Sequence, residues 1–264
     1  MSALRAVGVY EWKRSLTLVR IGWWLAMAAF PVMITILIRT LSDPQNQVSI
    51  ATQKSTWSMT LYALIPGVCV ALSVLLTAAP AVAAELEQRS WAYLATRPNG
   101  IFWLLLGKFL VSVTWGTSAA WLGTIFSVAL CGMDEQLRML LSLLALSLLS
   151  AIAYSALYIL VGAMFPKRAM VFCMMYTVIV ELVFGSIPAV INRMTIQFRL
   201  RTLFVNWMPL DKRMKEDSVF KYVMVDGSSW MQCFWLITLS VLFLTAAIVV
   251  AHRKEFTSAT EGDV

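Results

Sequence analysis

The chain has 264 residues, of which 60% are hydrophobic and only 13% are charged, and its formal net charge is +7. Soluble domains carry roughly 45–50% apolar and about 25% charged residues, so this composition excludes an ordinary soluble domain and indicates a protein whose solvent is lipid. The basic surplus fits cytoplasmic loops and anionic headgroups. Nucleic-acid binding is not expected, because no basic cluster is interleaved with stacking aromatic residues.

Residues 1–20 predict an amphipathic helix that lies in the plane of the inner membrane surface. An apolar stripe passes through Trp12, whereas Lys13 and Arg14 lie around the other side of the same helix. Tryptophan at the interface and basic residues on the polar face are typical of such interfacial helices. We therefore expect a cytoplasmic elbow helix here, marked by these three residues.

Six predominantly apolar runs are each long enough to cross a membrane, for which a helix needs about 20 residues. They cover residues 21–38, 57–84, 101–131, 139–165, 169–191 and 230–251. Together they predict an all-α integral membrane domain over residues 21–251, followed by a cytoplasmic tail over residues 252–264. The outer connection between the fifth and sixth spans would comprise residues 192–229.

Basic residues in the short connections predict the orientation. The N-terminal segment, the connection between the second and third spans, the short turn with Lys167 and Arg168, and the C-terminal tail all fall on one side of six spans. Lysine and arginine in short loops mark the cytoplasmic side, so we expect both termini in the cytoplasm of a cell inner or plasma membrane. The basic outer connection disagrees with this pattern, but long loops follow the charge rule poorly.

The connection after the second span predicts a short polar helix that ends in a turn. Glu85 and Arg89 stand four residues apart, and Pro98, Asn99 and Gly100 form a turn signal. Spacing alone leaves two interpretations open. The helix either lies among lipid headgroups or forms a docking surface for a cytoplasmic partner.

Glu181 is the one acidic residue deep within a predicted span. A carboxylate in the membrane costs about 2.5 kcal/mol or more unless it is paired, protonated or hydrated, so we expect it to face the protein interior or a water-filled cavity. It is either a pathway or proton-relay residue, or a protonated glutamate bonded to a neighbouring helix. Together with Glu181, Pro66, Met174 and Phe184 are the candidate residues of a substrate pathway. Helix packing and core filling explain the last three residues equally well.

The outer connection contains a third amphipathic pattern. Ile196, Leu200, Leu203 and Trp207 recur at helical spacing, and basic residues lie near them. This pattern predicts a helix that rests on or dips into the outer leaflet.

The sequence contains none of the common catalytic, nucleotide-binding or metal-binding motifs. The sequence has no GxxxxGK[ST] phosphate loop, no HExxH, no GxSxG and no CxxC pair, so no catalytic, cofactor or metal site is expected. Cys131 and Cys233 both lie near the predicted outer surface, and a disulfide between them stays open.

The layout resembles the membrane permease of ABC-type exporters, the six-helix ABC-2-type class. The segment "ELEQRSWAYLATRPNGIFWLLLGKFLVS" is similar to the family pattern of an acidic residue, a short helix ending near "RP", and a Gly-Lys pair. These positions are Glu85, Arg97, Pro98, Gly107 and Lys108. The segment "ELVFGSIPAVINRMTIQFRLRTL" is similar to the fifth-span glutamate and re-entrant outer helices of that class. The chain departs from many members in having "QRSWAYL" where they have a Gly-Thr pair.

The resemblance implies that the second connection is a coupling helix, seated in a cleft of a separate ATP-hydrolysing subunit. The contact residues would be Glu85, Glu87, Arg89, Trp91, Tyr93, Arg97, Lys167 and Arg168. Two such subunits would bind ATP and Mg²⁺, and the chain itself would be neither an enzyme nor a cofactor-binding protein. A second permease copy or paralogue would form the pathway with it, among membrane lipids. The alternatives are a proton-coupled carrier that uses Glu181 and an assembly subunit that transports nothing.

Overall fold

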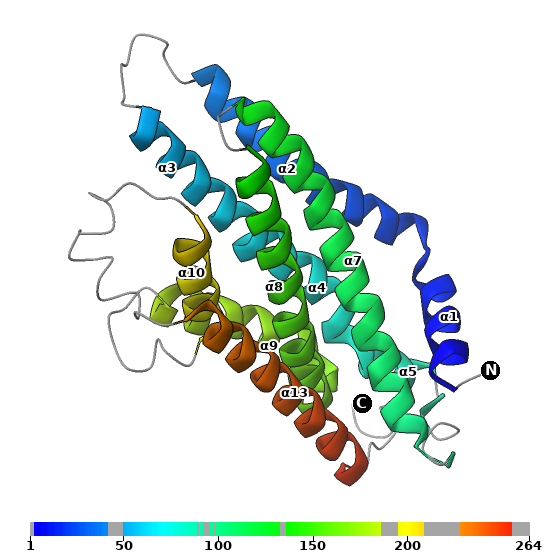
Figure 1. Ribbon diagram of the computed structural model, residues 1–264. Coiled ribbons are helices and arrows are strands. Elements are labelled where there is room, and N and C mark those ends of the chain that lie inside the picture. Colours follow the sequence, from blue (N-terminus) through cyan, green and yellow to red (C-terminus); the bar gives the residue numbers. More distant parts are fainter. Residues whose placement is uncertain are drawn as a thin grey trace.

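The computed structural model describes residues 3–41, 50–88, 90–91, 96–97, 99–132, 136–185, 195–208 and 228–254, and these residues are helical apart from short turns (Figure 1). Among them, five helices are long and apolar enough to cross a membrane. They are Leu18–Leu41, Gln53–Glu87, Gly100–Cys131, Gln136–Met164 and Ser229–Arg253. The chain is therefore an all-helical protein of the multi-pass membrane type.

The described elements fall into two halves of the chain. The first half comprises α1 (Ala3–Ser15), α2 (Leu18–Leu41), α3 (Ile50–Tyr62), η1 (Ala63–Cys69), α4 (Val70–Ala78), η2 (Ala79–Ala81), α5 (Ala83–Glu87) and α7 (Gly100–Cys131). The second half comprises α8 (Gln136–Met164), η3 (Pro166–Arg168), α9 (Ala169–Tyr176), η4 (Thr177–Phe184), α10 (Ile196–Trp207) and α13 (Ser229–Arg253).

The second predicted span is one composite rod, α3 to α5, interrupted by a π-helical turn at Pro66. A proline has no N–H for the helical ladder, so the ladder is locally rearranged around it. The carbonyl oxygen of Pro66 accepts a hydrogen bond of 2.7 Å from the Ser150 hydroxyl of α8. The π-helical turn thus has a backbone carbonyl bonded to a neighbouring helix.

Helix α7 lies at the centre of the bundle and packs against α1, α2, α4 and α8. Small residues permit this close approach. A Cβ atom added at Gly116 would lie 2.7 Å from Val74 of α4, and one at Gly123 would lie 2.7 Å from Pro31 of α2. Gly116 and Gly123 therefore serve close helix packing.

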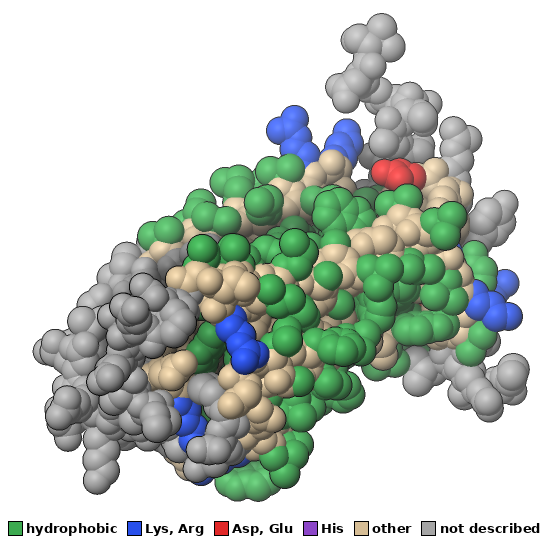
Figure 2. All heavy atoms as spheres, turned by 90° about the horizontal axis from the view of Figure 1, so that it is seen from above, with side chains coloured by type: hydrophobic (Ala, Val, Ile, Leu, Met, Phe, Trp, Pro, Cys, Tyr) green, Lys and Arg blue, Asp and Glu red, His purple; other side chains and the backbone are tan. Residues whose placement is uncertain are grey.

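Hydrophobic side chains cover much of the described surface, and the lysine and arginine side chains are few (Figure 2). The exposed large hydrophobic residues are especially frequent on α2 and α13, where Leu25, Met33, Phe234 and Val241 are each about half exposed or more. Such a continuous apolar surface exceeds what a soluble monomer exposes, and lipid would cover it in a membrane.

Helices α8 and α13 run in the same direction. The Lys254 ammonium after α13 donates to the Met164 carbonyl at the end of α8, at 2.5 Å, and the two helices pack along their lengths (Figure 1). The chain between them must therefore return to the other end of the bundle. Helices α9 and η4 cover Ala169–Phe184 of the predicted fifth span and are shorter than the five long helices. Residues 186–191 of that span lie outside the described residues.

The amphipathic helix predicted in the outer connection is present as α10. Its apolar positions Ile196, Leu200 and Leu203 are fully buried, and the helix packs against α8 and α13. The apolar face therefore contacts protein, whereas the sequence had suggested contact with the outer leaflet. The four cysteines of the chain are free thiols.

Candidate functional site

Gly107 determines how closely α1 approaches α7. A Cβ atom at this position would lie only 2.9 Å from Val7 of α1, so the absence of a side chain brings the two helices into direct contact. The next residue, Lys108, is consequently covered by α1 and is only 9% exposed. A lysine inside an apolar helix then requires anionic partners.

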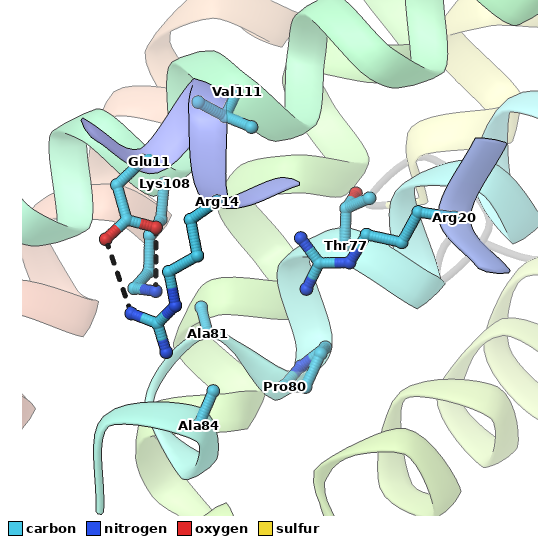
Figure 3. A pocket seen from close by; sticks show the side chains of 9 residues that line it. All are labelled: Glu11, Arg14, Arg20, Thr77, Pro80, Ala81, Ala84, Lys108 and Val111. Carbon is cyan, nitrogen blue, oxygen red and sulfur yellow. Dashed lines mark hydrogen bonds and ion pairs between the residues drawn. The ribbon is translucent and has the colours of Figure 1, made fainter. Parts of the chain in front are cut away.

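Two glutamates form ion pairs with this lysine. Its Nζ atom lies 3.1 Å from Oε2 of Glu11 in α1 and 2.8 Å from Oε1 of Glu85 in α5. Arg14 of α1 is the second cation, with Nη1 2.7 Å from Oε1 of Glu85 and 3.8 Å from Oε1 of Glu11. Figure 3 shows Glu11, Arg14 and Lys108 facing one another. We call Glu11, Arg14, Glu85 and Lys108 the ionic cluster.

Three of the four residues of the ionic cluster are buried, Arg14 is partly buried, and the cluster is electrically balanced. Glu85 is 2% exposed and Glu11 is 7% exposed, and two carboxylates face two cations. Removing a charge from water costs several kcal/mol, which a well-placed opposite charge offsets, and the loss of one partner leaves the other uncompensated. The four residues therefore hold α1, the end of the second span and α7 in one arrangement.

Next to the ionic cluster, aromatic residues connect α7 to α1 and α2. The Trp115 indole of α7 donates a 2.8 Å hydrogen bond to the Ser15 hydroxyl, which itself donates to the Trp12 carbonyl at 2.7 Å. The ring of Trp115 lies 5.9 Å from that of Trp12 and 6.3 Å from that of Trp24. These contacts fix the corner between α1 and α2 onto α7.

The connection that follows α5 is anchored to the cluster. The Ser90 hydroxyl donates to the Glu85 carboxylate, and the Ser90 amide donates to the Glu85 carbonyl at 3.1 Å. At its other end, Asn99 adopts a left-handed φ of 57°, and the Gly100 amide donates to the Arg97 carbonyl at 3.0 Å. The predicted turn is confirmed there. Helix α5 ends at Glu87, and residues 89 and 92–95 lie outside the described residues.

The predicted coupling residues fall into three groups. Glu87, Arg97, Lys167 and Arg168 are exposed. Glu85 and Trp91 are buried, so neither offers its side chain to a partner in this arrangement. Arg89 and Tyr93 are among the residues that the structure does not describe. The Glu85 carboxylate is bound within the chain by Arg14 and Lys108, and its predicted contact with an ATPase stays a prediction.

The three predicted elbow residues differ in their exposure and contacts. Lys13 is exposed, Trp12 is partly exposed and its ring contacts that of Trp115 at a tilt, and Arg14 belongs to the ionic cluster. Sequence reasoning missed Glu11 and Lys108 as a pair. The available signal was a lysine inside an apolar run, which needs a nearby carboxylate, but nothing in the pattern showed which one.

Glu181 lies in a second buried polar network. Its Oε1 atom accepts from the Ile196 amide at 3.1 Å and from the Tyr176 hydroxyl at 3.3 Å, and its Oε2 atom accepts from the Gln197 amide at 2.8 Å. The carboxylate thus caps the N-terminus of α10, where unpaired amides and the helix dipole favour a negative charge. The predicted interior location is confirmed, because Glu181 is only 2% exposed.

Gln197 connects this carboxylate cap to two buried tyrosines. Its Nε2 atom donates to the Tyr154 hydroxyl at 2.9 Å, and its Oε1 atom accepts from the Tyr62 hydroxyl at 3.1 Å. The network therefore links η4, α10, α8 and α3. Among the other candidate pathway residues, Pro66 is buried, Met174 is exposed on α9, and the Phe184 side chain lies outside the described set.

No protein-family model matches the chain, and comparison with curated proteins found no match either. A functional assignment therefore depends on the ionic cluster, the surrounding exposed residues and the course of the helices.

Proposed function

We propose that the chain is the permease subunit of an ATP-driven exporter, moved by a separate ATPase subunit that contacts the connection between α5 and α7. The observation that carries this proposal is the ionic cluster. It joins that connection rigidly to α1 and α7, at the end of the bundle where α13 also ends (Figure 1). A polar segment with so firm an attachment suits the transfer of force into the membrane helices.

In this mechanism the exposed residues make the contact and the ionic cluster transmits the movement. Glu87 and Arg97 flank the connection, and Lys167 and Arg168 form the neighbouring exposed turn η3. Closure of two ATPase subunits on ATP and Mg²⁺ would displace the connection. Because buried charges cannot separate cheaply, α1, α5 and α7 would shift as one body toward a second arrangement of similar energy.

The proposed topology has six crossings, with α1 as the elbow helix and both termini in the cytoplasm. The parallel course of α8 and α13 supports it, since the chain between them must return to the other end of the bundle. The contact end carries Lys13, Arg97, Lys167, Arg168 and Arg253 as exposed basic residues, which favours the cytoplasmic side.

A second permease copy or a paralogue would complete the export pathway. The exposed side chains of Met174, Met175 and Val178 give α9 and η4 an apolar face for such a partner. Methionine-rich surfaces adapt to different neighbours, so the same face suits an amphipathic cargo.

Isolation of the tagged chain from its native membranes tests the proposal. We expect an ATPase subunit to be retained by the wild-type chain and lost from the double variant Glu87→Lys, Arg97→Glu, whose charges are reversed at the proposed contact. Gln136→Lys, an exposed residue at the start of α8, is the control and should retain the ATPase.

Equal retention by all three chains would contradict the proposed contact, and absence of any ATPase would contradict the function. Transport by the purified chain alone in liposomes, driven by a pH gradient, would instead support a proton-coupled carrier. An assembly subunit would show neither ATPase retention nor transport.

A further inference from the structure

A groove opens between α2, α4, η2, α7 and α9, next to the ionic cluster. Its volume is about 280 Å³, near the lower end of the roughly 300–1,000 Å³ that is usual for small-ligand pockets. The apolar wall of the groove consists of Trp23, Trp24, Met27, Leu76, Trp115 and Met170. The mechanism proposed above makes no use of this groove.

A cation lies at one end of the groove. Arg20 lines both the groove and the smaller cavity beside the ionic cluster, and Figure 3 shows its side chain extending toward Thr77. The charged groups that face it are Arg14 and Glu11, and both are already paired in the cluster. The guanidinium of Arg20 forms no ion pair with a described side chain, so a positive charge remains for a ligand.

An unpartnered hydroxyl lies further along the same groove. Ser73 is only 8% exposed, lines the groove, and its Oγ atom has no hydrogen-bond partner among the described residues. A buried hydroxyl without a partner costs about 1–3 kcal/mol, which a ligand acceptor would recover. Ser73 precedes Thr77 by four residues, so it lies about one helical turn, roughly 5.4 Å, deeper than the end at Arg20.

We propose that this groove binds one anionic phospholipid of the surrounding membrane. Arg20 holds the phosphate through charge-assisted hydrogen bonds, Ser73 donates to an ester carbonyl one turn deeper, and an acyl chain lies along the tryptophans. This order of cation, hydroxyl and apolar wall matches the order of phosphate, ester and hydrocarbon along a lipid. The site does not depend on the proposed ATP-driven function.

Native mass spectrometry of the full-length chain tests the site. The protein is equilibrated with phosphatidylglycerol and phosphatidylcholine of identical acyl chains, and the retained lipid is counted. We expect phosphatidylglycerol to be retained preferentially, and Arg20→Gln to lower that affinity about tenfold, as for the loss of one charge-assisted hydrogen bond. Arg253→Gln, which removes an exposed arginine at the end of α13, should leave the preference unchanged.

A second variant tests the apolar wall. Met170 is 43% exposed at the rim, so Met170→Trp narrows the groove without filling the core, and we expect it to lower the retention of both lipids. Equal retention of the two lipids by the wild-type chain would overturn the proposal. An equal effect of Arg20→Gln and Arg253→Gln would overturn it as well, by showing a general surface-charge effect. Displacement of the lipid by excess inorganic phosphate would overturn it by showing a simple phosphate site.

Discussion

Lys108 has two carboxylate partners and little contact with solvent. The contact of α1 and α5 with α7 therefore depends on the charge of this one residue. Substitution by methionine keeps the length of the side chain but leaves Glu11 and Glu85 with Arg14 alone. We predict that Lys108→Met lowers the free energy of unfolding by about 3–5 kcal/mol, the usual cost of breaking a buried ion pair. Denaturant titration in detergent micelles measures this loss.

The charge balance of the ionic cluster provides an internal control. In the double variant Lys108→Met, Glu11→Gln, one cation and one anion are removed together, and we expect part of the stability to return. Lys167→Met, an exposed lysine of η3, should change little. If Lys108→Met unfolds at the same denaturant concentration as Lys167→Met, the ionic cluster has no structural role.

Glu181 provides a second residue-scale prediction, because its two carboxylate oxygens receive two backbone amides of α10. In Glu181→Gln, one of those amides must face an NH₂ group. We predict a loss of about 1–3 kcal/mol in unfolding free energy and faster hydrogen exchange at Ile196 and Gln197. Glu87→Gln, at an exposed glutamate, is the matched control. Unchanged exchange combined with lost transport would favour the proton-relay interpretation instead.

At the scale of elements, the seating of α1 on α7 depends on the missing side chain at Gly107. Gly107→Ala places a Cβ atom 2.9 Å from Val7, and we predict that α1 moves outward at a cost of about 1–3 kcal/mol. Val7→Ala in the same chain removes the obstructing methyl groups and should restore most of the loss. Thermal unfolding of the two variants measures the difference. Equal destabilisation in both would show that the contact does not position α1.

The elements themselves could largely be predicted from the sequence, because hydrophobic runs and helical spacing are local signals. The five long helices and the helix that contains Leu200 and Leu203 follow from such patterns. The contacts between side chains of different helices could not be predicted in the same way. Glu11 and Lys108 are 97 positions apart, and Glu181 caps a helix that begins 15 residues later in the sequence. A buried charge indicates that a partner exists, but only the folded chain identifies it.

For the whole molecule, we propose that a separate ATPase holds the end of the bundle where α1, α5 and the start of α7 meet. The start of α7 and the start of α8 lie at opposite ends of the bundle (Figure 1). Arg97, just before α7, and Gln136, the first residue of α8, are both exposed. These two positions therefore distinguish a partner at the contact end from one elsewhere on the molecule.

The most direct measurement is photo-crosslinking in native membranes, with a photoreactive amino acid placed at position 97 or at position 136. We expect a covalent adduct between the chain and an ATPase subunit from position 97 and none from position 136. An ATPase adduct from position 136, or from neither position, would contradict the proposal.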